Sequence, residues 1–268
     1  MFDFSEEEIK RYSRHILLPE VGGKGQKKIN RAKVLLIGAG GLGAPVGYYL
    51  AAAGVGKIGI VDGDHVELSN LQRQIVHSTN DLGKNKAVSA QETLLALNPG
   101  IEVVTYQERV TSQNIFGILE DYEIVVDGTD NFPTRYLVND ACVMTRKPLS
   151  HGAVFRFHGQ AMTIVPGEGP CYRCLFREPP PPGMTATCEE AGVLGVLPGL
   201  IGLIQATEVL KLILGEGKAL VGKLLIYEAL DMEFKKMKIR RDPDCEVCGD
   251  HPVITELIDY EEFCRVNF

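Results

Sequence analysis

The sequence contains no tryptophan, and aromatic residues of all kinds make up only 7% of its 268 residues. Basic residues are outnumbered, because 28 lysines and arginines face 35 aspartates and glutamates, which gives a formal net charge of -7. General affinity for nucleic acid or for an anionic membrane needs concentrated lysine and arginine. We therefore expect no nucleic acid and no membrane among the partners of this chain.

The chain also shows no apolar leader. Its first residues, MFDFSEEEIKRYSRH, are rich in charge and contain no small-residue cleavage site. A cytoplasmic location is the resulting expectation. Residues 193–214 form an apolar run of nearly the length of a membrane span. Gln205, Glu208 and Lys211 interrupt this run three residues apart, as a polar stripe on one face of a helix, so we predict a core helix there.

Short apolar runs alternate with helical patterns through the first half of the sequence. The predicted strands are residues 33–37, 57–61, 101–106 and 124–126, and the predicted helices are residues 6–15, 44–53 and 86–97. Strands that alternate with helices in this way are typical of a parallel sheet covered on both faces. The fold class predicted is therefore α/β, with a Rossmann-like, doubly wound, mainly parallel sheet.

The pattern changes from His151 onward. An alternating stretch at residues 159–165 and a strand at residues 223–227 read as antiparallel strands that continue the same sheet. We therefore expect a single domain over residues 1–268, divided into a nucleotide-binding part at about 30–150 and a second part at about 151–268.

A glycine-rich loop joins the first predicted strand to a helix. Gly38, Gly40 and Gly43 form G-x-G-x-x-G, and Gly41 adds a further glycine. Such a loop lets backbone N–H groups and a helix N-terminus approach a phosphate. The second strand ends at Asp62, where a carboxylate binds ribose hydroxyls in this fold. The loop therefore predicts a nucleotide site.

The same fingerprint serves nicotinamide dinucleotides, so an NAD-dependent oxidoreductase remains the alternative. A triphosphate carries more charge and recruits arginine, lysine and a divalent metal. Arg73 and Lys86 follow the second strand, with Asn70 and Gln72 beside Arg73. These residues favour ATP, although each basic residue alone could be a solvated surface charge.

Another predicted strand ends in Asp127, followed by Asp130 and Asn131. Carboxylates at this edge of a parallel sheet lie in the crevice where ligands bind, and their oxygens suit Mg²⁺ that bridges phosphates. The alternative is that Asp130 or Asn131 caps the following helix. We predict Asp130 as the magnesium-binding residue.

Four of the seven cysteines form two short pairs, Cys171-x-x-Cys174 and Cys245-x-x-Cys248. This is the spacing of a tetrahedral Cys₄ zinc site, and a site filled by four thiolates leaves no position for substrate. Disulfides are the competing interpretation, which a reducing compartment disfavours. We therefore predict a structural zinc site.

Three cysteines remain. Cys142 lies in an apolar helical stretch and is predicted to be buried, and Cys264 has no supporting features. Cys188 follows a proline-rich stretch and precedes a helix, where a thiol can become reactive. Because Glu189 and Glu190 oppose that activation, the residues alone leave Cys188 open between a nucleophile and an inert thiol.

Taken in order, these elements resemble the MoeB/ThiF/HesA family, whose members are similar to ubiquitin-activating enzymes. The resemblance runs from RYSRH near the start to the second cysteine pair and includes the Asp62 strand and Lys86. Its motifs are GAGGLG, SNLQRQ, DGTDNFPTRYLVND, CYRC, CEEAGVLG and CEVC.

The resemblance implies where ATP and the partners bind. It also implies a homodimer in which Arg14 of one copy reaches the nucleotide of the other, and a crossover loop and carrier-binding surface in residues 151–268. The implied nucleotide residues are Gly40, Gly41, Asp62, Ser69, Asn70, Leu71, Gln72, Arg73, Lys86, Asp130 and Asn131.

The reaction implied is ATP-dependent adenylylation of the Gly-Gly carboxylate of a ubiquitin-like sulfur-carrier protein, with release of pyrophosphate. Sulfur then displaces AMP to give a thiocarboxylate for molybdopterin or thiamine biosynthesis, and Cys188 matches a cysteine that some members use covalently. Longer relatives carry a rhodanese domain, whereas this sequence stops at Phe268. We therefore expect a separate sulfur donor.

Overall fold

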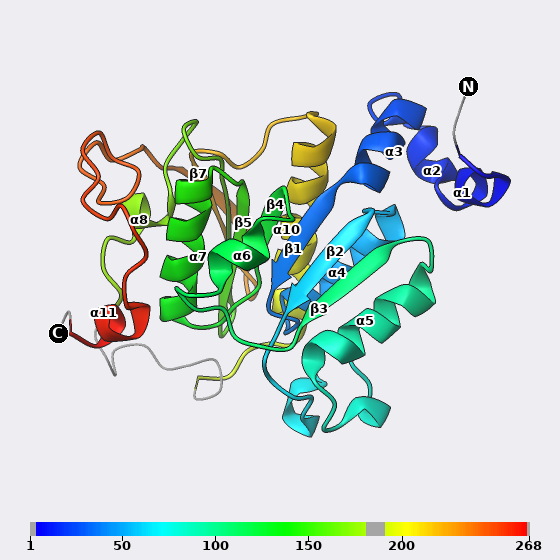
Figure 1. Ribbon diagram of the computed structural model, residues 1–268, viewed down its shortest axis with the longest axis horizontal. Helices are drawn as coiled ribbons and strands as arrows, with labels where there is room; N and C mark the ends of the chain where they lie inside the picture. The colour runs from blue at the N-terminus through cyan, green and yellow to red at the C-terminus, as the bar shows by residue number, and fades with distance from the viewer. Residues whose placement is uncertain (1–3, 181–190, 267–268) are drawn as a thin grey trace.

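The computed structural model describes residues 4–180 and 191–266 and contains one eight-stranded sheet (Figure 1). The strand order is β3-β2-β1-β4-β5-β6-β7-β8, in which the first five strands run parallel and each later strand runs antiparallel to its neighbour. The strands are β1 Lys33–Ile37, β2 Lys57–Val61, β3 Glu102–Tyr106, β4 Ile124–Asp127, β5 Leu149–Phe155, β6 His158–Ile164, β7 Lys223–Glu228 and β8 Glu233–Lys238. The parallel sheet with an antiparallel continuation is therefore confirmed.

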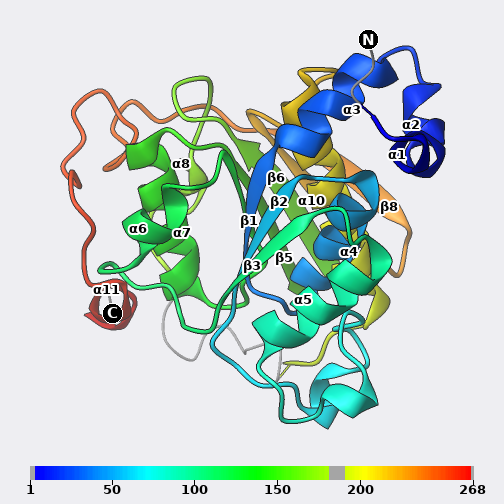
Figure 2. The same cartoon turned by 45° about the vertical axis from the view of Figure 1, so that its right-hand side comes forward.

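Helices cover both faces of this sheet, with α6 and α7 on one side and α4, α5 and α10 on the other (Figure 2). The α-helices are α1 Glu6–Arg11, α2 Ser13–Ile16, α3 Gly22–Arg31, α4 Gly43–Ala53, α5 Lys86–Leu97, α6 Ile115–Leu119, α7 Phe132–Thr145, α8 Tyr172–Leu175, α10 Val196–Leu214 and α11 Tyr260–Val266.

Alternation along β1 shows why both faces need cover. Val34 and Leu36 pack into the core beneath α4, α5 and α10, whereas Leu35 and Ile37 pack on the opposite face against α6 and α7. All four side chains are buried, as expected for a central parallel strand whose residues alternate between two apolar layers.

Helix α10 is the one described helix long and apolar enough to cross a membrane, yet it packs on α4 and on β5 and β6. Its polar residues face inward. Gln205 donates to the backbone oxygens of Asp127 and Ser150, and Glu208 accepts from the Thr163 hydroxyl at 2.6 Å. The predicted core helix is confirmed, and Gln205 and Glu208 of its polar stripe join the helix to the sheet, whereas Lys211 is partly exposed.

The predicted helix over residues 6–15 is divided in two. Tyr12, with φ -97° and ψ 11°, ends α1, and its side chain is buried. The Tyr12 hydroxyl accepts from the amide of Asn98 at 3.0 Å, and its ring packs closely over Gly54. The chain therefore changes direction at the residue whose side chain anchors this segment to the core.

Strands β5 and β8 were not anticipated in the sequence. Both faces of β5 are partly covered, so its residues show no clear two-residue alternation, and β8 is an exposed edge strand. A two-residue alternation of apolar and polar residues arises when one face of a strand is buried. An edge strand that is exposed along its whole length shows no such alternation.

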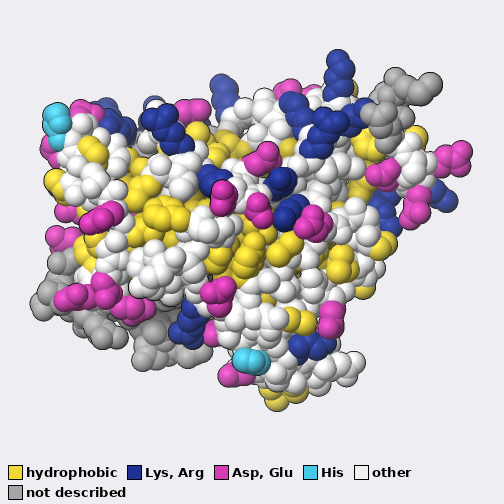
Figure 3. Space-filling model, viewed as in Figure 1, with side chains coloured by type: hydrophobic (Ala, Val, Ile, Leu, Met, Phe, Trp, Pro, Cys, Tyr) yellow, Lys and Arg dark blue, Asp and Glu magenta, His cyan; other side chains and the backbone are white. Residues whose placement is uncertain are grey.

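The surface carries charges of both signs. On the face drawn in Figure 3, lysine and arginine side chains are interspersed with aspartate and glutamate. This mixture differs from the continuous basic surface that binds nucleic acid.

Two glycines of the loop between β1 and α4 are required by the backbone itself. Gly38 adopts φ +97°, and a Cβ atom on Gly43 would lie 2.0 Å from the Gly38 carbonyl oxygen. Both positions therefore exclude a side chain without displacement of the loop.

We predict that Gly43→Ala lowers the free energy of unfolding by at least about 2 kcal/mol, because the added methyl group overlaps a backbone atom that cannot move freely. Urea denaturation followed by circular dichroism measures this. Gly117→Ala in α6 is the control, since nothing lies within 4 Å of its Cβ position. Equal midpoints for the two variants would contradict the steric argument.

Candidate functional site

A cavity of about 770 Å³ lies at the carboxyl ends of the parallel strands. It opens where strand order reverses, because β1 lies between β2 and β4 and the helices that follow β1 and β4 cover opposite faces. Ligands bind at such switch points in open α/β sheets. Residues predicted from the sequence that line it are Gly40, Gly41, Asp62, Arg73, Lys86, Asp130 and Asn131.

Asp62, at the end of β2, holds the glycine loop in place. Its carboxylate accepts hydrogen bonds from the backbone N–H groups of Ala39 at 2.8 Å and Asp64 at 2.9 Å. Burial raises the pKa of Asp62 above its ordinary value, although the two backbone N–H groups and Lys86 oppose that rise. The carboxylate therefore links the loop to the second strand at the cavity wall.

Lys86 enters the cavity as the first residue of α5. Asn85 caps this helix and donates to the backbone oxygens of Asp62 and Asp64, which fixes the helix N-terminus at the end of β2. The Lys86 ammonium lies 3.6 Å from the Asp64 carboxylate, which also pairs with Arg109 at 3.0 Å. These contacts place two positive charges along one wall.

Asp130 and Asp127, three residues apart, differ completely in their surroundings. Asp130 is exposed in the cavity wall, and no described residue donates a hydrogen bond to its carboxylate. Asn131 is the cap of α7, because its side-chain oxygen accepts from the Thr134 N–H at 2.9 Å. The capping alternative therefore holds for Asn131, and Asp130 keeps a free carboxylate that can bind a metal ion.

Asp127 is buried beneath the loop that carries Asp130. Its carboxylate accepts from His151 at 2.7 Å and from the backbone and hydroxyl of Thr129 at 3.0 and 2.6 Å. Burial acts to raise the pKa of Asp127, but the His151 hydrogen bond and the Arg135 charge hold it below its ordinary value. Asp127 is thus an ionised anchor for the loop and not a cavity ligand.

Several predicted residues do not line the cavity in this chain. The turn that precedes Arg73 consists of Ser69, Asn70, Leu71 and Gln72. In this turn the Ser69 carbonyl accepts a hydrogen bond from the Arg73 guanidinium at 3.1 Å. Asn70 is buried, and its side-chain oxygen accepts from the Glu67 N–H. This turn therefore positions Arg73.

Two other predicted residues are not placed at the cavity. Arg14 lies on α2, and no cavity residue of its own chain belongs to that helix. Cys188 lies outside the described residues.

The structure adds cavity residues that the sequence reasoning missed. Asp64 and Arg109 follow β2 and β3, so their place after predicted strands was an available signal. For Arg135, in the first turns of α7, the signal in the sequence was weaker. Leu257 and Tyr260, from the C-terminal segment, had none, because only the tertiary fold brings that segment to the cavity.

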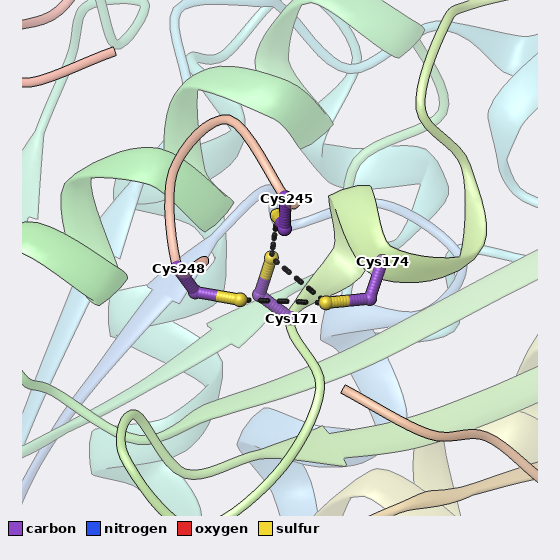
Figure 4. A group of neighbouring side chains, drawn as sticks. All are labelled: Cys171, Cys174, Cys245 and Cys248. Atoms are coloured by element: carbon purple, nitrogen blue, oxygen red, sulfur yellow. Dashed lines mark hydrogen bonds between the residues drawn. The ribbon is translucent and has the colours of Figure 1, made fainter. Parts of the chain in front are cut away.

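The four predicted metal ligands meet in space (Figure 4). Their sulfur atoms all lie within 4.8 Å of one another, with Cys171 to Cys245 at 3.6 Å and Cys174 to Cys248 at 3.3 Å. These separations exceed a disulfide bond, which is about 2.05 Å long. Four sulfurs around one tetrahedral zinc ion would be about 3.8 Å apart, given Zn–S bonds near 2.3 Å. The cluster therefore fits a metal ion.

A buried polar network joins this cluster to α7. Arg173, next to Cys174, makes a two-pronged ion pair with Asp140, at 2.8 Å through its terminal nitrogen. The Tyr260 hydroxyl donates to the same carboxylate at 2.9 Å, and Asn139 accepts from the Tyr172 N–H. The cysteine cluster, α7 and the C-terminal segment are therefore held as one unit beside the cavity.

Residues 12–247 match the ThiF family. Sulfur carrier protein adenylyltransferase of Thermus thermophilus is 53% identical to this chain, over 98% of the chain and 99% of that protein. The SAMP-activating enzyme of Haloferax volcanii is 52% identical, over 97% of the chain and 96% of that protein.

A solved structure of E. coli MccB with ATP has the same fold. It superposes with a TM-score of 0.78 and 26% sequence identity, and the match covers 89% of this chain and 74% of MccB. The similarity thus includes a protein crystallised with the nucleotide that the sequence favours.

We predict that Arg173→Met lowers the free energy of unfolding by about 3–5 kcal/mol, because it leaves the Asp140 carboxylate buried without its partner. Chemical denaturation measures this effect. Arg177→Met is the matched control, since Arg177 pairs with Asp242 but is 72% exposed, and it should cost at most about 1 kcal/mol. A small effect for Arg173→Met would mean that the network does not hold this region together.

Proposed function

This chain belongs to the ThiF family, and we infer that it is an ATP-dependent adenylyltransferase that activates a ubiquitin-like sulfur-carrier protein. The observation that carries this conclusion is the cavity at the switch point, which brings together the glycine loop, Asp62, the basic side chains of Arg73 and Lys86, and the carboxylate of Asp130. The NAD-dependent alternative leaves Arg73, Lys86 and Asp130 in this cavity without a role.

For the nucleotide, we propose that the backbone at Gly40 and Gly41 contacts the phosphates and that Asp62 binds the ribose. Asp62 already accepts two backbone hydrogen bonds, which fix its orientation, and a carboxylate can accept more. Arg73 and Lys86 supply positive charge for the phosphates. The predicted turn residues Ser69, Asn70, Leu71 and Gln72 contribute mainly by holding Arg73 at the wall.

We propose that Mg²⁺ binds at Asp130, beside Asn131. The side-chain oxygen of Asn131 caps α7, so the amide N–H groups of the same side chain are available to the nucleotide. A bound Mg²⁺ supplies charge neutralisation on the phosphates. The chain's own part is geometric, because Asp127 holds the Gly128–Asp130 turn and thereby the Asp130 carboxylate.

In the proposed reaction, a carboxylate oxygen of the carrier's terminal glycine attacks the α-phosphorus of ATP. A new P–O bond forms, the bond to the β-phosphate oxygen breaks, and pyrophosphate leaves with the electron pair. The chain accelerates this step by positioning the two reactants and by stabilising charge, without covalent chemistry of its own. Sulfur from a separate donor then displaces AMP, in a molybdopterin or a thiamine pathway, and Cys188 is a candidate for a covalent intermediate there.

The finer parts of the proposal concern assembly and location. We propose a homodimer in which Arg14 on α2 enters the site of the second copy, because no residue of that helix reaches its own cavity. We also propose a cytoplasmic location, since four free cysteines at metal-binding distance need reducing surroundings.

We propose that the ion held by Cys171, Cys174, Cys245 and Cys248 is zinc, with a structural role. Two pairs of thiolates around one ion are the ligand set that zinc prefers. The Asp242 N–H lies 3.4 Å from the Cys174 sulfur and supports its negative charge.

We predict that Asp130→Ala lowers carrier-dependent exchange of pyrophosphate into ATP by about 100-fold or more, because the metal-binding carboxylate is lost. The fold should be intact, since Asp130 is exposed and no described residue hydrogen-bonds it. Glu120→Ala, an exposed acidic residue at the end of α6, is the control. Wild-type exchange rates in Asp130→Ala would remove this residue from the mechanism.

We predict that the purified chain contains one zinc ion and that Cys245→Ser combined with Cys248→Ser abolishes this content. Thermal unfolding of that variant should occur roughly 5 °C or more below the unaltered chain, because the tether of the C-terminal segment is lost. Elemental analysis and calorimetry measure the two effects. Cys264→Ser, outside the cluster, should retain the ion, and a double variant with full zinc would refute the assignment.

A further inference from the structure

Four basic side chains line the cavity, and they differ in how their charges are matched. Lys86 and Arg109 both lie within ion-pair distance of Asp64, and Arg73 donates to the Ser69 carbonyl. Arg135 has no carboxylate within ion-pair distance among the described residues. The proposed nucleotide contacts use neither Arg109 nor Arg135, and of these two Arg109 is already paired with Asp64.

The surroundings of Arg135 leave one strong donor unused. Its terminal nitrogen donates to the Thr129 carbonyl at 3.3 Å, and its guanidinium stacks over the Phe132 ring at 5.2 Å. The Nε atom is enclosed yet has no hydrogen-bond partner. Because the Nε atom is enclosed, a ligand in the cavity can approach this guanidinium only at its terminal nitrogens.

The nearby carboxylate of Asp127 has other partners. Its oxygens accept hydrogen bonds from Thr129 and from His151, and none is formed with Arg135. Asp127 therefore balances the Arg135 charge at a distance, without accepting a hydrogen bond from it. The guanidinium is held in place by its neighbours, and Arg135 lines the cavity.

The position of Arg135 indicates which ligand group it meets. Asp62 and Lys86 follow β2, on one side of β1, whereas Arg135 follows β4 on the other side, as does Asp130, the proposed magnesium-binding residue. The cavity is also lined by apolar side chains of α7, of β5 and of the segment before α10, namely Leu137, Val154 and Val193. Apolar walls suit an extended peptide better than a triphosphate.

We propose that Arg135 binds the C-terminal carboxylate of the carrier protein and holds it for attack on the α-phosphorus. A planar guanidinium can donate two parallel hydrogen bonds to a carboxylate, which fixes both its distance and its orientation. This assignment rests on the proposed function and adds to it the residue that receives the second substrate.

The test compares binding of two forms of one probe. The probe is a ThiS-type carrier ending in Gly-Gly, made with a free terminal carboxylate and, by semisynthesis, with a terminal amide. The unaltered enzyme should bind the carboxylate form about 10- to 100-fold more tightly, as expected for a charged hydrogen-bonded pair. Arg135→Met, which keeps the apolar stem, should bind both forms equally, and Arg135→Lys should recover part of the difference.

Two controls make the outcome specific. Mg-ATP should bind Arg135→Met with nearly unchanged affinity in calorimetry, and Arg31→Met, an exposed arginine at the end of α3, should behave as the unaltered enzyme. The proposal is overturned if Arg135→Met still distinguishes carboxylate from amide, or if Mg-ATP binding falls in parallel, which would assign Arg135 to the phosphates. The comparison of the carboxylate and amide probes measures binding and does not depend on catalysis. Absence of pyrophosphate exchange in the unaltered enzyme would therefore contradict the proposed function and not the assignment of Arg135.

Discussion

One buried carboxylate joins the elements that shape the active site. Asp127 ends β4, accepts from His151 on β5, and holds the turn that presents Asp130. Its backbone oxygen accepts from Gln205 on α10, so the long apolar helix is fixed to the same point. An ionised group can be buried at this depth because its hydrogen bonds offset the lost hydration. The Asp130 carboxylate can then stay free at the cavity wall, because Asp127 beneath it supplies the structural contacts.

A second network brings the far end of the chain to the same cavity. The cysteine cluster lies beside Arg173, which forms an ion pair with Asp140. The Asp140 carboxylate also accepts a hydrogen bond from the Tyr260 hydroxyl. Tyr260 begins α11, and this segment forms part of the cavity wall. The four clustered cysteines do not line the cavity, yet they are joined to its wall through one shared carboxylate.

The cavity divides naturally between its two proposed substrates. The β2 side carries Asp62 and the basic groups paired with Asp64, and the β4 side carries Asp130 and Arg135. The α-phosphorus would lie between them, above the glycine loop at the point where strand order reverses.

The sequence by itself determined the central strands, the glycine loop and the two cysteine pairs, because each follows from local spacing. Strand β1 and helix α5 were predicted to the residue, since apolar periodicity and caps act over a few neighbouring positions. Only the tertiary structure revealed that Asp127 is buried as a partner of His151, turned Gln205 and Glu208 inward, and brought Tyr260 and Arg135 to the cavity. These outcomes depend on which distant elements pack together, and no local pattern records the partner that a side chain meets.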